Sequence, residues 1–63
     1  QEGISILEYI TNERIAMAQV LLRETDYTIY QVADRVGYPN YSYFSRVYKK
    51  MTGKTPQEYK KEF

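Results

Sequence analysis

The sequence predicts a small all-α domain of four helices, and three observations support this. Ser or Thr is followed three residues later by Glu or Gln at three places, and this capping-box pattern marks the start of a helix. Apolar residues then recur three and four positions apart, as they do along one face of a helix. Glycine and proline stand between these stretches, where helices end and turns begin.

The first and longest helix is predicted to start at the box that joins Ser5 to Glu8 and to run to about Glu24. The hydroxyl of Ser5 can accept a hydrogen bond from the backbone N–H of Glu8, and the carboxylate of Glu8 can accept one from the N–H of Ser5. Its apolar residues are expected to be Ile15, Ala18 and Leu22 on one stripe, with Ile10, Met17 and Leu21 beside it.

Two further helices are predicted on either side of a glycine turn. The box that opens with Thr28 starts a short helix over residues 28–36, which Gly37 ends, and Asn40 caps a helix over residues 40–52. The residues expected to face the core are Ile29, Val32, Ala33 and Val36 in the first and Phe44, Val47, Tyr48 and Met51 in the second.

A last helix is predicted over residues 55–63. Gly53 ends the helix before it, and Thr55 opens the third capping box. Pro56 then occupies the first helical position, where its missing N–H costs nothing. All connections are only a few residues long, so the chain forms one compact unit without a linker of low complexity.

The composition excludes several classes of protein. The 63 residues contain no cysteine and no histidine, so we expect no metal site, no cofactor and no thiol or imidazole catalysis. No nucleophile–base pair, phosphate loop or carboxylate dyad can be assembled, and an enzyme is not expected. The apolar runs are too short to span a bilayer, so a cytoplasmic protein without a membrane partner is expected.

Charge is divided unevenly along the chain. Residues 1–34 carry two basic and six acidic side chains, whereas residues 35–63 carry seven basic and two acidic ones. The net charges are therefore −4 and +5. A basic half is typical of a protein that binds a polyanion, although a solvated lysine-rich surface explains the charge alone equally well.

The helix over residues 40–52 has a polar face suited to DNA. Projection at 100° per residue puts small hydroxyls and long cations opposite the apolar residues: Ser42, Ser45, Arg46 and Lys49, with Lys50 at the edge. The small side chains would let the backbone approach a surface while Arg46 reaches a guanine edge in the major groove. Together with the preceding short helix and the turn at Gly37, this arrangement is a helix-turn-helix, the alternative being an ordinary αα-hairpin.

The motifs resemble those of a known family. The segments Ile29-x-x-Val32-Ala33-x-x-Val36-Gly37-Tyr38, Tyr43 to Lys50 and Gly53-x-Thr55-Pro56-x-x-Tyr59 closely resemble the second helix-turn-helix of AraC/XylS-family transcription regulators. The segment Tyr9 to Leu22 resembles the family's long linker helix. The resemblance implies sequence-specific DNA binding and a homeodomain-like three-helix unit after the linker helix.

The resemblance also implies a division of the chain. Residues 1–27 correspond to the linker helix and residues 28–63 to the second helix-turn-helix subdomain, so the family's first subdomain would be missing. A weak internal repeat agrees with this. Gly3 and Gly53 each begin the pattern Gly, any residue, Ser or Thr, any two residues, Glu, Tyr.

Carried over by position, the resemblance implies two sets of DNA contacts. The residues on the bases would be Tyr41, Ser42, Ser45 and Arg46. Those near phosphates would be Thr28, Ile29, Tyr30, Asn40, Tyr43, Lys49 and Lys50, with a supporting role as the alternative for Tyr43. Three aromatic positions, Tyr38, Tyr48 and Tyr59, would be core, and Arg14 would be structural through an ion pair with Asp34 or a neighbour.

Double-stranded DNA is thus the expected partner, through residues 41–50 in the major groove. RNA polymerase and the protein's own N-terminal regulatory domain are further partners that the resemblance implies. The alternative function is a protein-interaction module that contacts those same two partners. The family's regulatory domain is either a phosphorylatable receiver or a sugar-sensing barrel. The sequence over residues 23–30 and 37–40 is similar to that of members with a receiver.

Overall fold

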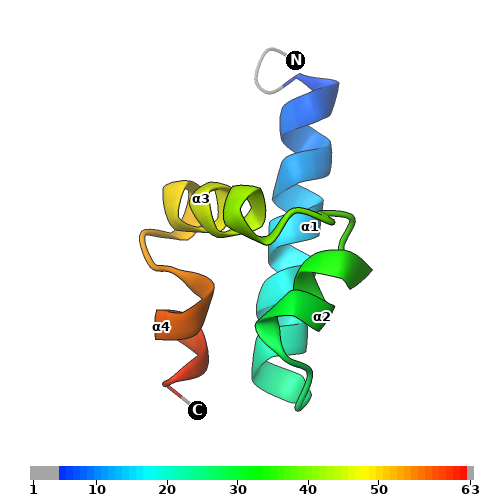
Figure 1. Ribbon diagram of the computed structural model, residues 1–63. Coiled ribbons are helices and arrows are strands. Elements are labelled where there is room, and N and C mark those ends of the chain that lie inside the picture. The colour runs from blue at the N-terminus through cyan, green and yellow to red at the C-terminus, as the bar shows by residue number, and fades with distance from the viewer. Residues whose placement is uncertain (1–4, 63) are drawn as a thin grey trace.

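The computed structural model describes residues 5–62, which form four helices and no strand. They are α1 (Ile6–Glu24), α2 (Ile29–Arg35), α3 (Tyr41–Thr52) and α4 (Pro56–Lys60). Figure 1 shows α1 running the length of the molecule, with α3 crossing it and α2 and α4 on either side of its C-terminal part. The predicted all-α architecture is confirmed; Gly3, which carries part of the internal repeat, lies outside the described residues.

The predicted caps are all present. Ser5, Thr28 and Thr55 each form a reciprocal capping box, and Pro56 lies at the first position of α4. Asn40 caps α3 through its side chain, and Gly53 ends that helix in the left-handed conformation at φ 88°. These caps satisfy backbone N–H groups that a helix start otherwise leaves without a partner, so they fix where each helix begins.

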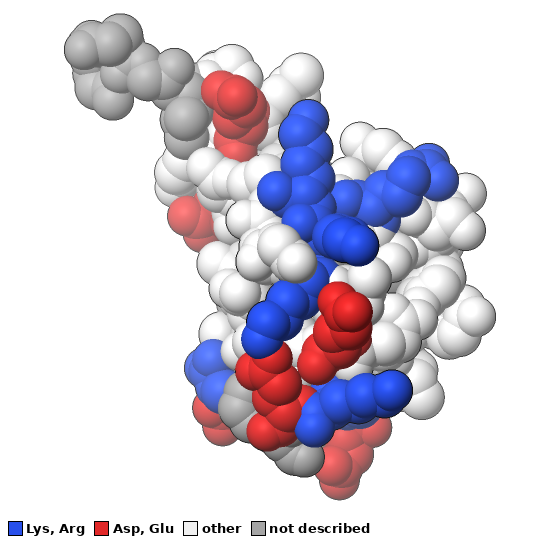
Figure 2. Space-filling model, turned by 90° about the vertical axis from the view of Figure 1, so that its left-hand side faces the viewer, with Lys and Arg blue, Asp and Glu red and all other residues white. Residues whose placement is uncertain are grey.

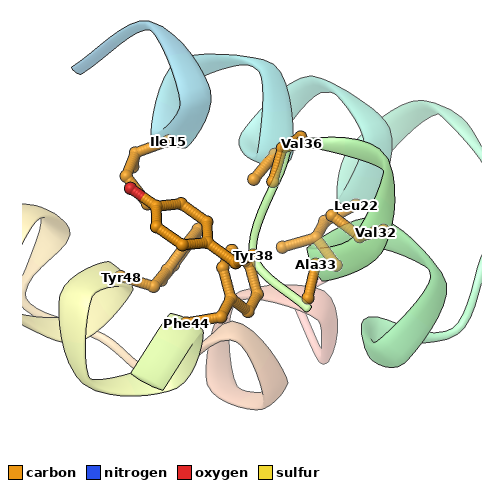
Figure 3. Close-up of a cluster of buried hydrophobic side chains, with 9 residues drawn as sticks. Ile15, Leu22, Val32, Ala33, Val36, Tyr38, Phe44 and Tyr48 are labelled. Carbon is orange, nitrogen blue, oxygen red and sulfur yellow. The ribbon is translucent and has the colours of Figure 1, made fainter. Parts of the chain in front are cut away.

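The core lies where α1, α2 and α3 meet. Figure 3 shows side chains from these helices and from the turn after α2 converging on one cluster. Its members are Ile15, Ala18, Leu22, Val32, Ala33, Val36, Tyr38, Phe44 and Tyr48, and Ile29, Val47 and Tyr59 pack against it. The core role predicted for the three tyrosines at positions 38, 48 and 59 is therefore confirmed.

Some residues predicted to face the core do not. Met17 and Met51 are 53% and 43% exposed, and Ile10 is 38% exposed. Ile10 belongs to the N-terminal part of α1, which extends beyond the other helices in Figure 1. Periodicity identified these apolar faces correctly, but the rest of the described chain is too small to cover their full width.

The last helix is shorter than the predicted 55–63. Helix α4 ends at Lys60. The N–H of Lys61 donates to the carbonyl of Gln57, and the N–H of Glu62 donates to that of Tyr59, which tightens the last turn. Glu62 then forms an ion pair with Lys54, which draws the chain end back toward the start of α4. Residue 63 lies outside the described part of the chain.

Arg14 has a structural role, but the expected partner is wrong. Its guanidinium donates a hydrogen bond of 3.3 Å to the carbonyl of Gly37 and lies 5.3 Å from the ring centre of Tyr38, rather than pairing with Asp34. Gly37 has a φ of 98°, which a glycine adopts readily and other residues rarely do. The contact ties the long helix directly to the turn that sets α2 against α3.

Within residues 5–62, no helix is long and apolar enough to cross a membrane.

Candidate nucleic-acid interface

Helix α3 has one face packed into the core and one face open to solvent. Phe44 and Tyr48 are 0% exposed and hold the helix against α1 and α2. On the opposite side Ser42, Arg46 and Lys49 are exposed, and Ser45 is partly exposed. The projection made from the sequence is confirmed for these four residues, which lie together on the outer face of α3.

The cations on this face are available to a ligand. Arg46, Lys49 and Lys50 form no ion pair within residues 5–62, whereas Arg23 pairs with Glu24 and Lys54 with Glu62. An unpaired guanidinium keeps its planar set of N–H donors for a bidentate contact. The outer face of α3 therefore concentrates hydrogen-bond donors that form no ion pair within the described part of the chain.

The two lysines of α3 leave the helix on different flanks. Lys50 lines an open groove of about 400 Å³ between α3 and α1, together with Leu7, Thr11 and Met51. Lys49 instead lies close enough to Glu58 in α4 to lower the pKa of that carboxyl, although hydrogen bonding to Thr55 is the larger cause. Figure 2 shows Lys and Arg side chains gathered on the side of the molecule that α3 and α4 occupy, with acidic side chains next to them.

Tyr43 lies on the α1 flank rather than on the outer face. Its ring centre is 5.7 Å from that of Tyr38, and the side chain borders the grooves that α3 and the preceding turn form with Leu7 and Thr11. It remains 52% exposed. This position allows both roles expected for Tyr43, since the ring supports the turn while the other half of the side chain faces solvent.

Asn40 presents a side-chain amide donor, and the start of α2 presents backbone donors, near the same surface. The side-chain oxygen of Asn40 accepts from the N–H of Tyr43 at 2.9 Å, so the amide nitrogen of Asn40 is left to donate elsewhere. At the start of α2, the N–H of Thr28 donates to the side chain of Gln31 at 2.8 Å. The N–H groups of Ile29 and Tyr30 form no hydrogen bond among the described residues, and Ile29 is half-buried against the core.

An aromatic pair that the sequence alone did not predict joins the starts of α2 and α3. The ring centres of Tyr30 in α2 and Tyr41 in α3 are 4.5 Å apart, with the planes tilted by 33°. Burial raises the pKa of the Tyr41 hydroxyl above its ordinary value, with a smaller contribution from Tyr30. The only signal in the sequence was an aromatic residue at the beginning of each helix, which does not specify that the two meet.

The donor set determines what the surface can bind. The described residues contain no cluster of carboxylates that could hold a metal ion. The outer face of α3 offers hydroxyls, a guanidinium and ammonium groups, which suit phosphate oxygens and the acceptors on base edges.

The chain is similar in sequence to known helix-turn-helix proteins. A family model described as a helix-turn-helix domain matches residues 1–62. The arabinose operon regulatory protein of Salmonella typhimurium is 43% identical over 60 residues, which are 95% of this chain and 21% of the relative. The transcriptional activator RhaR of Yersinia pseudotuberculosis is 36% identical over 63 residues, all of this chain and 22% of the relative.

A solved structure shares the fold. The C-terminal domain of AraT, a response regulator from Geobacillus stearothermophilus, superimposes with a TM-score of 0.92 at 38% identity. The superposition covers 97% of this chain and 50% of that one. The chain thus spans about a fifth of the length of the curated relatives and half of this solved domain.

Proposed function

The chain belongs to the AraC-type helix-turn-helix family of DNA-binding transcription regulators, and from this premise we propose that α3 enters the major groove of double-stranded DNA and reads its sequence. The observation that carries the proposal is the outer face of α3, where cations that form no ion pair within residues 5–62 lie opposite the face that packs into the core. A helix anchored in this way presents its outer side chains at fixed positions to a groove.

Four residues are proposed to contact bases. Arg46 makes a bidentate contact with the O6 and N7 of a guanine, and Ser42 and Ser45 donate to or accept from neighbouring base edges. Tyr41, at the first position of α3, packs against a thymine methyl group. Each of the four is at least partly exposed, which such contacts require.

Phosphate contacts are proposed on both sides of α3. Lys49 and Lys50 leave the helix on different flanks, which fits a helix in a groove bordered by two phosphate backbones. Further donors lie at the helix starts and on the α1 flank: the Asn40 amide, the Thr28 and Tyr43 hydroxyls, and the backbone N–H groups of Ile29 and Tyr30.

We further propose that the chain is part of a longer regulator that acts in the cytoplasm, with residues 1–27 as the linker helix and residues 28–63 as the second helix-turn-helix subdomain. The relatives are about five times as long as the chain, and the exposed apolar residues of α1, such as Leu7 at 77%, suit contact with another part of such a protein. Its own N-terminal regulatory domain and RNA polymerase are the proposed protein partners.

Selection of bound sequences from a randomised duplex pool tests the proposal. This chain and the full-length protein that carries it are each incubated with the pool at two salt concentrations. Arg46→Ala is expected to lose about 1–3 kcal/mol of discrimination at one base position, because a bidentate contact disappears. Lys50→Ala is expected to weaken all sequences alike and to reduce the salt slope by about 1.

Arg23→Ala is the matched control, since it removes the same side chain from α1, where Arg23 pairs with Glu24. It should leave the selected motif unchanged. If the full-length protein selects no motif and its binding does not depend on salt, the DNA-reading proposal is wrong, and a module that binds protein partners becomes the account to pursue.

A further inference from the structure

The contact between Tyr30 and Tyr41 links the two helix starts that face the proposed DNA surface. Tyr30 is the second residue of α2 and Tyr41 the first residue of α3. Their ring centres are 4.5 Å apart at a tilt of 33°, which is within the range of attractive aromatic pairs. The contact spans the whole helix-turn-helix, because it joins residues on either side of the turn.

The pair is asymmetric. Tyr30 is 67% exposed, whereas Tyr41 is only partly exposed. Tyr30 is therefore the outer ring of the pair and packs against one side of Tyr41. Burial, with a smaller contribution from Tyr30, raises the pKa of the Tyr41 hydroxyl, which is consistent with this arrangement. A ring held on one side by the protein occupies fewer rotamers before any ligand arrives.

We infer that Tyr30 is a positioning residue for sequence readout: it holds the ring of Tyr41 in the orientation in which Tyr41 contacts its base. This inference rests on the proposed function, since it requires α3 in the major groove. Holding a side chain in its bound conformation lowers the entropy lost on binding. Tyr30 thereby contributes to base discrimination through Tyr41, in addition to any contact of its own with phosphate.

The two roles of Tyr30 predict different behaviour. A phosphate contact uses the hydroxyl or the backbone N–H of Tyr30 and affects all DNA sequences alike. A positioning role uses the ring and affects the preference at the one base that Tyr41 contacts. Tyr30→Phe keeps the ring and removes the hydroxyl, whereas Tyr30→Ala removes both, so the two variants separate the roles.

The experiment selects bound sequences with the full-length protein as wild type and as Tyr41→Ala, Tyr30→Ala and Tyr30→Phe variants. Tyr30→Ala is expected to reduce the preference at the same position as Tyr41→Ala, by about twofold to tenfold. Tyr30→Phe is expected to retain that preference, whatever happens to total affinity. Tyr9→Ala is the matched control, because Tyr9 is also more than half exposed but lies on α1, and it should leave the motif unchanged.

Four outcomes overturn the inference. In the first, Tyr30→Ala weakens every sequence alike and keeps the base preference, which makes Tyr30 a phosphate contact only. In the second, Tyr30→Phe loses the preference as well, which assigns the readout to the hydroxyl. In the third, Tyr41→Ala changes no position while Arg46→Ala does, so that DNA reading stands without Tyr41. In the fourth, the wild type selects no motif, and then the proposed function fails too.

A measurement without DNA tests the geometry by itself. Titration of the tyrosine ring signals by NMR gives the pKa of Tyr41 in the wild type and in Tyr30→Ala. Because the outer ring shields Tyr41, its removal is expected to lower the pKa of Tyr41 toward the ordinary 10.0. An unchanged pKa would show that Tyr30 does not cover Tyr41 in solution, which also overturns the inference.

Discussion

Replacement of Tyr48 by phenylalanine is expected to stabilise the domain. Tyr48 is 0% exposed, packed between Phe44 and Tyr59 with ring centres at 5.8 and 6.1 Å. Its hydroxyl is buried and forms no hydrogen bond of ordinary geometry among residues 5–62, although the Gln19 side chain lies near enough to lower its pKa slightly. A hydroxyl in this position loses its hydrogen bonds to water on folding and gains no well-formed bond in return.

The size of the effect follows from that loss. An unsatisfied buried hydroxyl costs about 1–3 kcal/mol, and part of this is offset by the small void that its removal leaves. We therefore expect Tyr48→Phe to raise the free energy of unfolding by about 1 kcal/mol at neutral pH. For a domain of this size that corresponds to a rise in Tm of roughly 4–8 °C.

The same substitution should also remove a dependence on alkaline pH. Burial raises the pKa of Tyr48 to about 12 from 10.0, with a smaller contribution from Tyr59, while Gln19 acts in the opposite direction. The folded state therefore keeps this proton at a pH where the unfolded state has lost it. The stabilisation is complete below pH 10 and falls as the pH rises toward 12, by about 3 kcal/mol in total.

Urea denaturation of the wild type and of Tyr48→Phe, at neutral pH and in steps up to about pH 12, measures both effects. The difference between the two proteins should grow over the alkaline range, since contributions from the other tyrosines cancel. Tyr38→Phe is the control at neutral pH, because Tyr38 is also a core residue but its hydroxyl is not fully buried. If Tyr48→Phe is destabilising, and its effect is not additive with Gln19→Leu, then the hydroxyl is bonded to Gln19 and the reasoning is refuted.

Other substitutions probe the turns and the caps. Gly37→Ala and Gly53→Ala should each cost about 1–2 kcal/mol in urea denaturation because of their positive φ. Gly37→Ala should cost more, since a new Cβ would lie 3.0 Å from the Arg14 guanidinium carbon, whereas the space at Gly53 is open; equal costs would contradict this. Hydrogen bonds from Thr55 hold the pKa of Glu58 below its ordinary value, so its stabilisation is present above the unfolded-state pKa and is lost on acidification. Glu58→Gln should keep the hydrogen bond to the Thr55 N–H and show a smaller fall in Tm between about pH 6 and pH 3; an unchanged fall would assign the acid dependence to other carboxylates.

The helix starts could be predicted because they are set locally, whereas the end of α4 could not, since no capping residue marks it. In a capping box, the side chain and the backbone that it satisfies are three residues apart, so the pattern around Ser5, Thr28 or Thr55 contains the whole interaction. The exposure of Ile10 and Met51 could not be predicted in the same way. Periodicity shows which side of a helix is apolar, but how much of that side is covered depends on where the other helices lie.

In the candidate site too, features set within one helix could be predicted, whereas contacts between helices could not. The outer face of α3 followed from 100° per residue alone, and Ser42 and Arg46 lie on it as expected. Contacts between distant residues could not be read in this way. Arg14 reaches the carbonyl of Gly37, 23 residues away, and Tyr30 meets Tyr41 across a turn, so both depend on how the helices are set against each other. The base and phosphate contacts of individual residues remain predictions.

The two faces of α3 separate stability from specificity, except at one place. Ser42 and Arg46 touch solvent and not the core, so substitutions there should change the unfolding free energy by no more than about 0.5 kcal/mol while they change the DNA sequence that is bound. Sequence preference can therefore vary among proteins with this core without loss of the fold. Tyr41 is the exception, because its ring is partly buried against Tyr30. If Tyr41 contacts a base as proposed, a change at position 41 alters that contact and also breaks the contact between α2 and α3, so we expect a new base preference there to need a matching residue at position 30.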